Sequence, residues 1–113
     1  QAPGFNSWFE ALAHMQKQID HINFDICLLG CGAYGFPLAA YVKSKGKKAV
    51  HLGGALQLLF GIRGKRWENP DYGVKAWNIP YGSYLSLMNE HWIRPKKNDI
   101  PLNANQVEDA CYW

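Results

Sequence analysis

Strong charge, paired cysteines and long hydrophobic runs are all scarce in this sequence. Its 12 Lys and Arg against 9 Asp and Glu give a net charge of +3 with His neutral, too mild for a nucleic-acid-binding surface. The longest uncharged run, residues 26–42, is shorter than a membrane span and contains three glycines and a proline, so it predicts a buried strand, turn and helix. We therefore expect neither a nucleic-acid partner nor a membrane span.

The three cysteines, Cys27, Cys31 and Cys111, are odd in number and have no paired spacing. This usage favours reduced thiols in a cytoplasmic protein. Cys31 and His51 have no further ligands at recognisable spacing, so we expect no metal site. Residues 1–13 have neither the basic start nor the apolar block of a secretory signal. Because the sequence begins with Gln1 rather than Met, we expect residues 1–113 to be a single domain, the C-terminal fragment of a longer protein.

Residues 24–54 contain the pattern around which the chain is organised. Gly30, Gly32 and Gly35 follow an apolar run in G-x-G-x-x-G spacing, and Pro37 suits the first turn of a helix. An apolar run of this kind is typical of a strand that is covered on both faces of a parallel sheet. The predicted elements are a strand at 24–29, a helix at 38–45 ended by Gly46, a second strand at 49–52 and a second turn at Gly53-Gly54.

Less regular segments flank this βαβ unit. Ser7 and Glu10 stand in capping-box spacing at the start of an amphipathic helix over residues 6–22. Further on we expect a short helix at 55–60, an edge strand at 74–79, a helix at 83–91, irregular structure from Arg94 and a docked aromatic end at 111–113. The fold class is therefore α/β: a Rossmann-like βαβ core with a small, mostly parallel sheet, an N-terminal amphipathic helix and an irregular C-terminal segment.

The two glycine loops predict an anion-binding site at one edge of the sheet. Parallel strands joined by a crossover helix point the same way, so both loops lie beyond the carboxyl edge. Each loop leads into a helix whose free N–H groups and positive dipole end attract phosphate. His51, at the end of the second strand, could project into the same space as a hydrogen-bonding or acid–base group. It is a weak catalytic candidate, and the catalytic residues are otherwise unknown.

Each candidate residue also has a structural interpretation. In this interpretation the glycines merely permit tight turns and close packing, and His51 is a side chain whose hydrogen bonds are satisfied at a strand end. Tyr34 can stack on a ligand or plug the core. Arg63 and Arg66 can clamp a diphosphate or belong to a solvated basic turn. Cys31 can be a nucleophile at a helix start or a small loop filler.

The sequence lacks the acid that a dinucleotide site requires. In that fingerprint an Asp or Glu about 20 residues after the glycines holds the ribose hydroxyls. Val50, His51 and Leu52 occupy that place, and no acid occurs between Asp25 and Glu68. This argues against NAD or FAD as the cofactor.

Three motifs occur in order: Gly-x-Gly-Ala-Tyr-Gly at 30–35, His-x-Gly-Gly at 51–54 and Gln-x-x-Phe-Gly-Ile-x-Gly-x-Arg-Trp at 57–67. With Trp8-Phe9-Glu10 and the Cys-Tyr-Trp ending, they resemble a set of largely uncharacterised bacterial proteins. The arrangement is also similar to the C-terminal half of the GT-D-type glycosyltransferase fold. That resemblance implies sugar transfer from a nucleotide-sugar. The family's Asp-x-Glu motif, which serves the metal and the donor, lies in its N-terminal half and is missing from this chain.

Two functions follow from these observations. The first is a binding domain for a nucleotide-sugar or another phosphorylated ligand in a glycosyltransferase-like protein. Its candidate ligand-binding residues are Gly30, Gly32, Tyr34, Gly35, His51, Gly53, Gly54, Gln57, Arg63 and Arg66. The second is a non-catalytic Rossmann-like module that associates with its own upstream domain or forms a homo-oligomer, since aromatic residues anchor interfaces and a small sheet leaves an edge unpaired.

Overall fold

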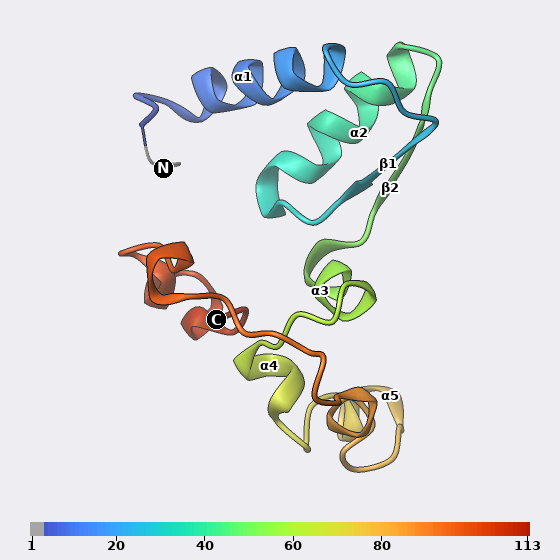
Figure 1. Cartoon of the computed structure of the whole chain (residues 1–113), viewed down its shortest axis with the longest axis vertical. Coiled ribbons are helices and arrows are strands. Elements are labelled where there is room, and N and C mark those ends of the chain that lie inside the picture. The colour runs from blue at the N-terminus through green and yellow to red at the C-terminus, as the bar shows by residue number, and fades with distance from the viewer. Residues whose placement is uncertain (1–3) are drawn as a thin grey trace. The chain divides into compact units, whose positions relative to one another are not determined.

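The computed structural model describes residues 4–113, and the chain divides into two compact units. The first unit ends at Leu56 and the second is Gln57–Trp113. That residues 1–113 are one domain of a longer protein stays a prediction. The first unit is mixed α/β and holds a small parallel sheet (Figure 1). The second consists of short helices, turns and irregular segments.

The first unit contains the predicted βαβ arrangement. Its elements are α1 (Trp8–Asp20), β1 (Ile26–Leu29), α2 (Gly35–Ser44) and β2 (Lys48–His51). The two strands are parallel, with Ile26 opposite Lys48 and Leu29 opposite His51. Helix α2 packs against both strands, and α1 packs against α2 (Figure 1). The prediction of an α/β chain with a small parallel sheet is confirmed.

Helix α1 begins as its sequence predicts. The hydroxyl of Ser7 accepts a hydrogen bond from the amide of Glu10 at 3.1 Å, and the Glu10 carboxylate accepts one from the amide of Asn6 at 2.9 Å. Two backbone N–H groups at the helix start are thereby satisfied. At the other end, Tyr41 of α2 donates to the Asp20 carboxylate at 2.7 Å, which ties the two helices together.

Helix α2 ends in a Schellman motif centred on Gly46. This glycine has φ +79°, and its amide bonds to the Lys43 carbonyl at 3.0 Å while the Lys47 amide bonds to the Val42 carbonyl at 3.3 Å. The predicted terminator is confirmed. The helix begins at Gly35, so Pro37 is its third residue, where the missing N–H still costs no intrahelical bond.

The sheet is covered on one face only within residues 4–56. Ala11, Leu29, Leu38 and Val42 form the buried core between the sheet and the helices. On the opposite face Ile26, Leu28 and Val50 are exposed by 49%, 40% and 39%. The prediction that the first strand is covered on both faces is therefore wrong here, because the helices that pack on the sheet all lie on one side.

The second unit is built around Trp67, which is buried against Tyr72 and Tyr84. Its helices are α3 (Leu56–Leu59, which spans the boundary), α4 (Lys65–Glu68) and α5 (Val74–Trp77), with 3₁₀ turns at Leu85–Leu87, Lys97–Asp99, Ala104–Gln106 and Glu108–Ala110. A single parallel bridge joins Ile62 to Ile93.

Two predicted elements of the second unit are wrong. The expected edge strand at 74–79 is helix α5, which is bounded by left-handed residues Gly73 (φ +81°) and Asn78 (φ +51°) and is closed by the Trp77 amide on the Gly73 carbonyl at 2.9 Å. The expected helix at 83–91 is only the 3₁₀ turn Leu85–Leu87. Met88 leaves the helical region there with ψ 140°.

The aromatic C-terminus is docked, as predicted. The amide of Arg66 donates to the Cys111 carbonyl at 2.8 Å, and that of Lys65 donates to the Trp113 carbonyl at 3.4 Å. The last three residues therefore satisfy two free N–H groups at the start of α4. Among residues 4–113, no helix has the length and apolar character needed to cross a bilayer.

Candidate functional site

Both glycine turns lie at the carboxyl edge of the sheet. Strand β1 ends at Leu29 and leads through a 3₁₀ turn, Gly32–Tyr34, into α2. Strand β2 ends at His51 and leads through a second one, Gly53–Ala55, into α3. Because the strands are parallel, the two turns leave the same edge.

Gly32 and Gly53 occupy equivalent places in these turns. Both are left-handed, with φ +52° and +57°, and a Cβ built on either would meet nothing within 4 Å. Each begins its 3₁₀ turn, and neither amide has a hydrogen-bond acceptor in the part of the chain that the structure describes. Both turns thus present an open amide at this edge, of the kind that binds phosphate oxygens.

Gly30 and Gly35 serve close packing instead. A Cβ on Gly30 would lie 2.7 Å from Cδ2 of Leu56 and 2.9 Å from the Gly53 carbonyl oxygen. A Cβ on Gly35 would lie 2.1 Å from Cε1 of His51. A larger residue at Gly30 would collide with the second turn, and one at Gly35 would displace the His51 ring. The structural interpretation holds for these two glycines, and a ligand-binding role for them stays a prediction.

His51 joins the second strand to the start of α2. Its ring lies over Gly35 and meets Phe36 edge to face, with centroids 5.2 Å apart. Its Nδ1 is 3.2 Å from the Leu29 carbonyl oxygen. A carbonyl only accepts, so Nδ1 carries the proton, and in the neutral ring Nε2 is left as an acceptor. Nε2 has no hydrogen bond to any of residues 4–113.

Tyr34 and Cys31 have structural surroundings. The Tyr34 ring stacks on Trp8 of α1 at 5.3 Å with an interplanar angle of 9°, and both side chains are half-buried. A role for Tyr34 in stacking on a ligand stays a prediction. Burial, with the nearby Cys27 thiol adding to it, raises the pKa of the Cys31 thiol. The thiol therefore stays protonated near neutral pH, which weakens it as a nucleophile.

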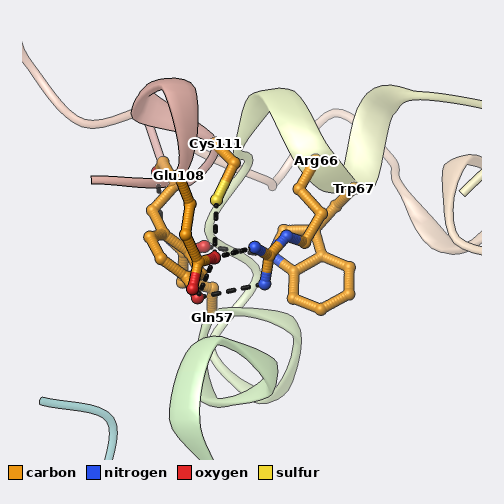
Figure 2. A network of polar contacts seen from close by, with 6 residues as sticks. Gln57, Arg66, Trp67, Glu108 and Cys111 are labelled. Atoms are coloured by element: carbon orange, nitrogen blue, oxygen red, sulfur yellow. Dashed lines mark hydrogen bonds and ion pairs between the residues drawn. The ribbon is translucent and has the colours of Figure 1, made fainter. Parts of the chain in front are cut away.

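Gln57 and Arg66 belong to a polar network inside the second unit (Figure 2). The Gln57 side chain donates to the Tyr112 carbonyl at 2.9 Å and accepts from the Trp67 indole N–H at 3.0 Å. Arg66 forms an ion pair with Glu108 and donates to the Tyr112 hydroxyl at 3.0 Å. Both side chains thus hold the C-terminal segment against α4.

Arg63 is also paired within this unit. Its Nη1 lies 3.3 Å from the Glu68 carboxylate, which forms a second ion pair with Arg94. Burial alone would raise the pKa of Glu68, but hydrogen bonds and charge from the two arginines bring it below its ordinary value. A diphosphate at Arg63 or Arg66 would have to compete with these carboxylates, and a binding role for Arg63, Arg66 and Gln57 stays a prediction.

Sequence reasoning missed both carboxylates. Glu68 and Arg94 are 26 residues apart, and Glu108 and Arg66 are 42 apart, so no local spacing signals either pair. Comparison with known protein families, with curated proteins and with solved structures finds no match to this chain.

Within residues 4–113 no three His, Cys, Asp or Glu side chains gather as metal ligands would.

Proposed function

We propose that the first unit binds a phosphorylated ligand, a nucleotide-sugar in particular, at the carboxyl edge of β1 and β2. The observation that carries this proposal is the pair of open, left-handed glycines, Gly32 and Gly53, that end two parallel strands at one edge. In this proposal the βαβ unit is part of a Rossmann-like core, and α2 adds the positive end of its dipole to the same edge.

Phosphate and hydroxyl groups would meet different partners in this site. The amides of Gly32 and Gly53, with Gly54 beside them, would donate to phosphate oxygens. The free Nε2 of His51 is an acceptor and would take a hydrogen bond from a hydroxyl rather than from an unprotonated phosphate. A ligand that carries both a phosphate and a hydroxyl, such as a sugar phosphate or nucleotide-sugar, can bind both the amide donors and the His51 acceptor, whereas a simple anion binds only the amides.

The motif resemblance supports the same ligand class. Two of its three motifs, Gly-x-Gly-Ala-Tyr-Gly and His-x-Gly-Gly, are the two turns of this site. We therefore propose that the chain forms the donor-binding part of a glycosyltransferase-like protein. Metal and acidic groups for sugar transfer would come from the half of the family's fold that carries its Asp-x-Glu motif.

A thermal-shift panel tests this proposal on the chain, with nucleotide-sugars, nucleoside diphosphates and inorganic phosphate as the probes. A ligand at ten times its Kd stabilises the folded state by about 1.4 kcal/mol. We expect a nucleotide-sugar to stabilise most, and His51→Ala to bring it down to the level of the matching nucleotide. His14→Ala, on the exposed side of α1, is the matched control and should change nothing. No stabilisation by any probe at millimolar concentration overturns the proposal.

A second candidate function is association, which the uncovered sheet face favours. Ile26, Leu28 and Val50 lie side by side on that face, and parallel sheets normally have both faces covered. The partner would be the upstream domain of the same protein or a second copy. Sedimentation velocity tests self-association of the chain. Leu28→Glu should abolish it, while Leu102→Glu, at an exposed position of the other unit, should not. A strictly monomeric wild-type chain overturns the homo-oligomer.

A further inference from the structure

A groove of about 520 Å³ runs between α2 and β2. From α2 it is lined by Phe36, Ala39, Ala40 and Lys43, and from the strand side by Lys47, Lys48 and Ala49. The four α2 positions are three or four residues apart around one side of the helix. No residue of β1 lines the groove, so it follows the side of β2 that faces away from β1.

Three lysines supply the charge of this groove. Lys43, Lys47 and Lys48 form no ion pair with any carboxylate in residues 4–113, and Asp20 instead pairs with Lys45 at 3.5 Å. Lys47 lies over the Phe24 ring, 4.3 Å from its centroid. Phe36, 78% exposed, adds an apolar surface at the other end. A complementary partner therefore combines negative charge with apolar side chains.

The groove runs beside backbone groups that can pair with another strand. The amide of Lys48 donates to the carbonyl of Asp25, which precedes β1, and the amide of Leu52 donates to that of Leu29 at the end of β1. Alternate residues of a strand bond to opposite neighbours, so the backbone groups of Ala49 point to the other edge. The sheet has two strands in the described chain, and that edge of β2 is unpaired. An unpaired edge is a template for an added strand.

We propose that this edge of β2 binds an extended, acidic segment of a partner protein as a third strand. The backbone of the segment pairs with Ala49, its carboxylates meet the three lysines, and its apolar side chains lie against Phe36 and the alanines of α2. Charge complementarity selects an acidic partner over a basic one. This surface adjoins the carboxyl edge through Phe36, which meets His51, and the uncovered apolar face through Lys48, which lies opposite Ile26. Its test uses neither a phosphorylated ligand nor self-association, so its failure is distinguishable from theirs.

Fluorescence anisotropy with three labelled octapeptides tests the proposal on the full chain. The peptides alternate valine with glutamate, with glutamine or with lysine. We expect the glutamate peptide to bind at least about tenfold more tightly than the other two, with an affinity that falls as salt is added. Replacing Lys43, Lys47 and Lys48 by Glu should remove the binding, and the matched replacement of Lys75, Lys96 and Lys97 by Glu, which changes the net charge equally, should preserve it.

Backbone pairing is tested with the same glutamate peptide N-methylated at alternate residues. Methylation blocks donation to the edge and leaves every charge in place, so we expect binding to be lost and the amide shift of Ala49 to disappear. Equal binding of the methylated peptide overturns strand addition. Absence of binding by the glutamate peptide overturns the proposal. A wild-type dimer that dissociates in the three-lysine variant would also overturn it, because the edge of β2 would then bind a second copy of the chain and not an acidic partner.

Discussion

The imidazole of His51 lies directly on the Cα of Gly35, so closely that a Cβ there would be 2.1 Å from the ring carbon Cε1. This contact links the end of β2 to the first residue of α2. It holds together the two turns that carry Gly32 and Gly53. The Leu29 carbonyl, which accepts from Nδ1, leaves Nε2 as the acceptor of the neutral ring. The geometry of the proposed site therefore depends on the absence of a side chain at residue 35.

Gly35→Ala should destabilise the first unit through this contact. Overpacking of a well-filled site costs about 1–3 kcal/mol, measured as the change in free energy of unfolding in urea. His51→Ala in the same chain should recover most of that loss, because the methyl group then fills the vacated space. A double mutant whose loss equals the sum of the two single losses would show that the two residues do not interact.

Gln57→Leu should destabilise the second unit. The change leaves the Trp67 indole N–H and the Tyr112 carbonyl without the partners that Gln57 gives them at 3.0 and 2.9 Å. An unsatisfied buried polar group costs about 1–3 kcal/mol. Gln57→Glu, which keeps the acceptor for Trp67 and loses the donor to Tyr112, should fall between the wild type and Gln57→Leu in urea unfolding. Indistinguishable urea midpoints for all three proteins would show that the hydrogen bonds of Gln57 to Trp67 and Tyr112 do not stabilise the second unit.

Acid should loosen the second unit through Glu108. Its hydrogen bonds from Arg66, then from Cys111 and Tyr112, lower the pKa of its carboxyl below the ordinary value of 4.5. A carboxyl with a lowered pKa stabilises the fold above its ordinary pKa and loses that contribution as the pH falls through the folded value. We therefore expect the urea midpoint to be steady near neutral pH and to fall once the pH drops below about 4.5.

Glu108→Gln should flatten this acid dependence, because the group that titrates is gone. Glu68 contributes in the same direction through Arg94 and Arg63, so some slope remains. Glu90→Gln, at a side chain 87% exposed, is the matched control and should leave the wild-type profile. An unchanged pH profile in Glu108→Gln would show that Glu108 does not cause the loss of stability in acid.

Ala110→Gly should stabilise the chain. Glu108, Asp109 and Ala110 are left-handed in succession, with φ of 48°, 53° and 57°. A residue with a Cβ costs roughly 1 kcal/mol or more in this region, and glycine avoids most of that cost. We expect a gain of about 0.5–1 kcal/mol in the free energy of unfolding. Ala76→Gly, in the right-handed helix α5, should instead lose stability.

Local signals in the sequence were enough to predict the first unit. The spacing of Ser7 and Glu10, the glycine that ends α2 and the two apolar runs each act within a few residues, and all reappear in the structure. Residues 74–79 resemble a strand in sequence because Val, Trp and Ile favour strands, whereas the left-handed Gly73 and Asn78 close a single helical turn.

The roles of the charged candidates could not be predicted in the same way. The partners of Arg66 lie more than 40 residues along the chain, and the spacing of the basic residues carries no sign of them. Similarly, G-x-G-x-x-G spacing does not distinguish a glycine that is required for close packing from one whose amide is free to bind a ligand. The difference between Gly35 and Gly32 comes from the His51 ring, which belongs to another strand.

Amide chemical shifts of Gly32 and Gly53 during titration with a nucleotide-sugar test whether these two glycines bind its phosphates. Gly46 and Gly82 are the internal controls, because they are also left-handed but their amides already bond to the carbonyls of Lys43 and Pro70. We expect the amides of Gly32 and Gly53 to shift together and saturate with one Kd while those of Gly46 and Gly82 stay unchanged. Unchanged shifts at both Gly32 and Gly53, up to millimolar ligand, would contradict the proposed site.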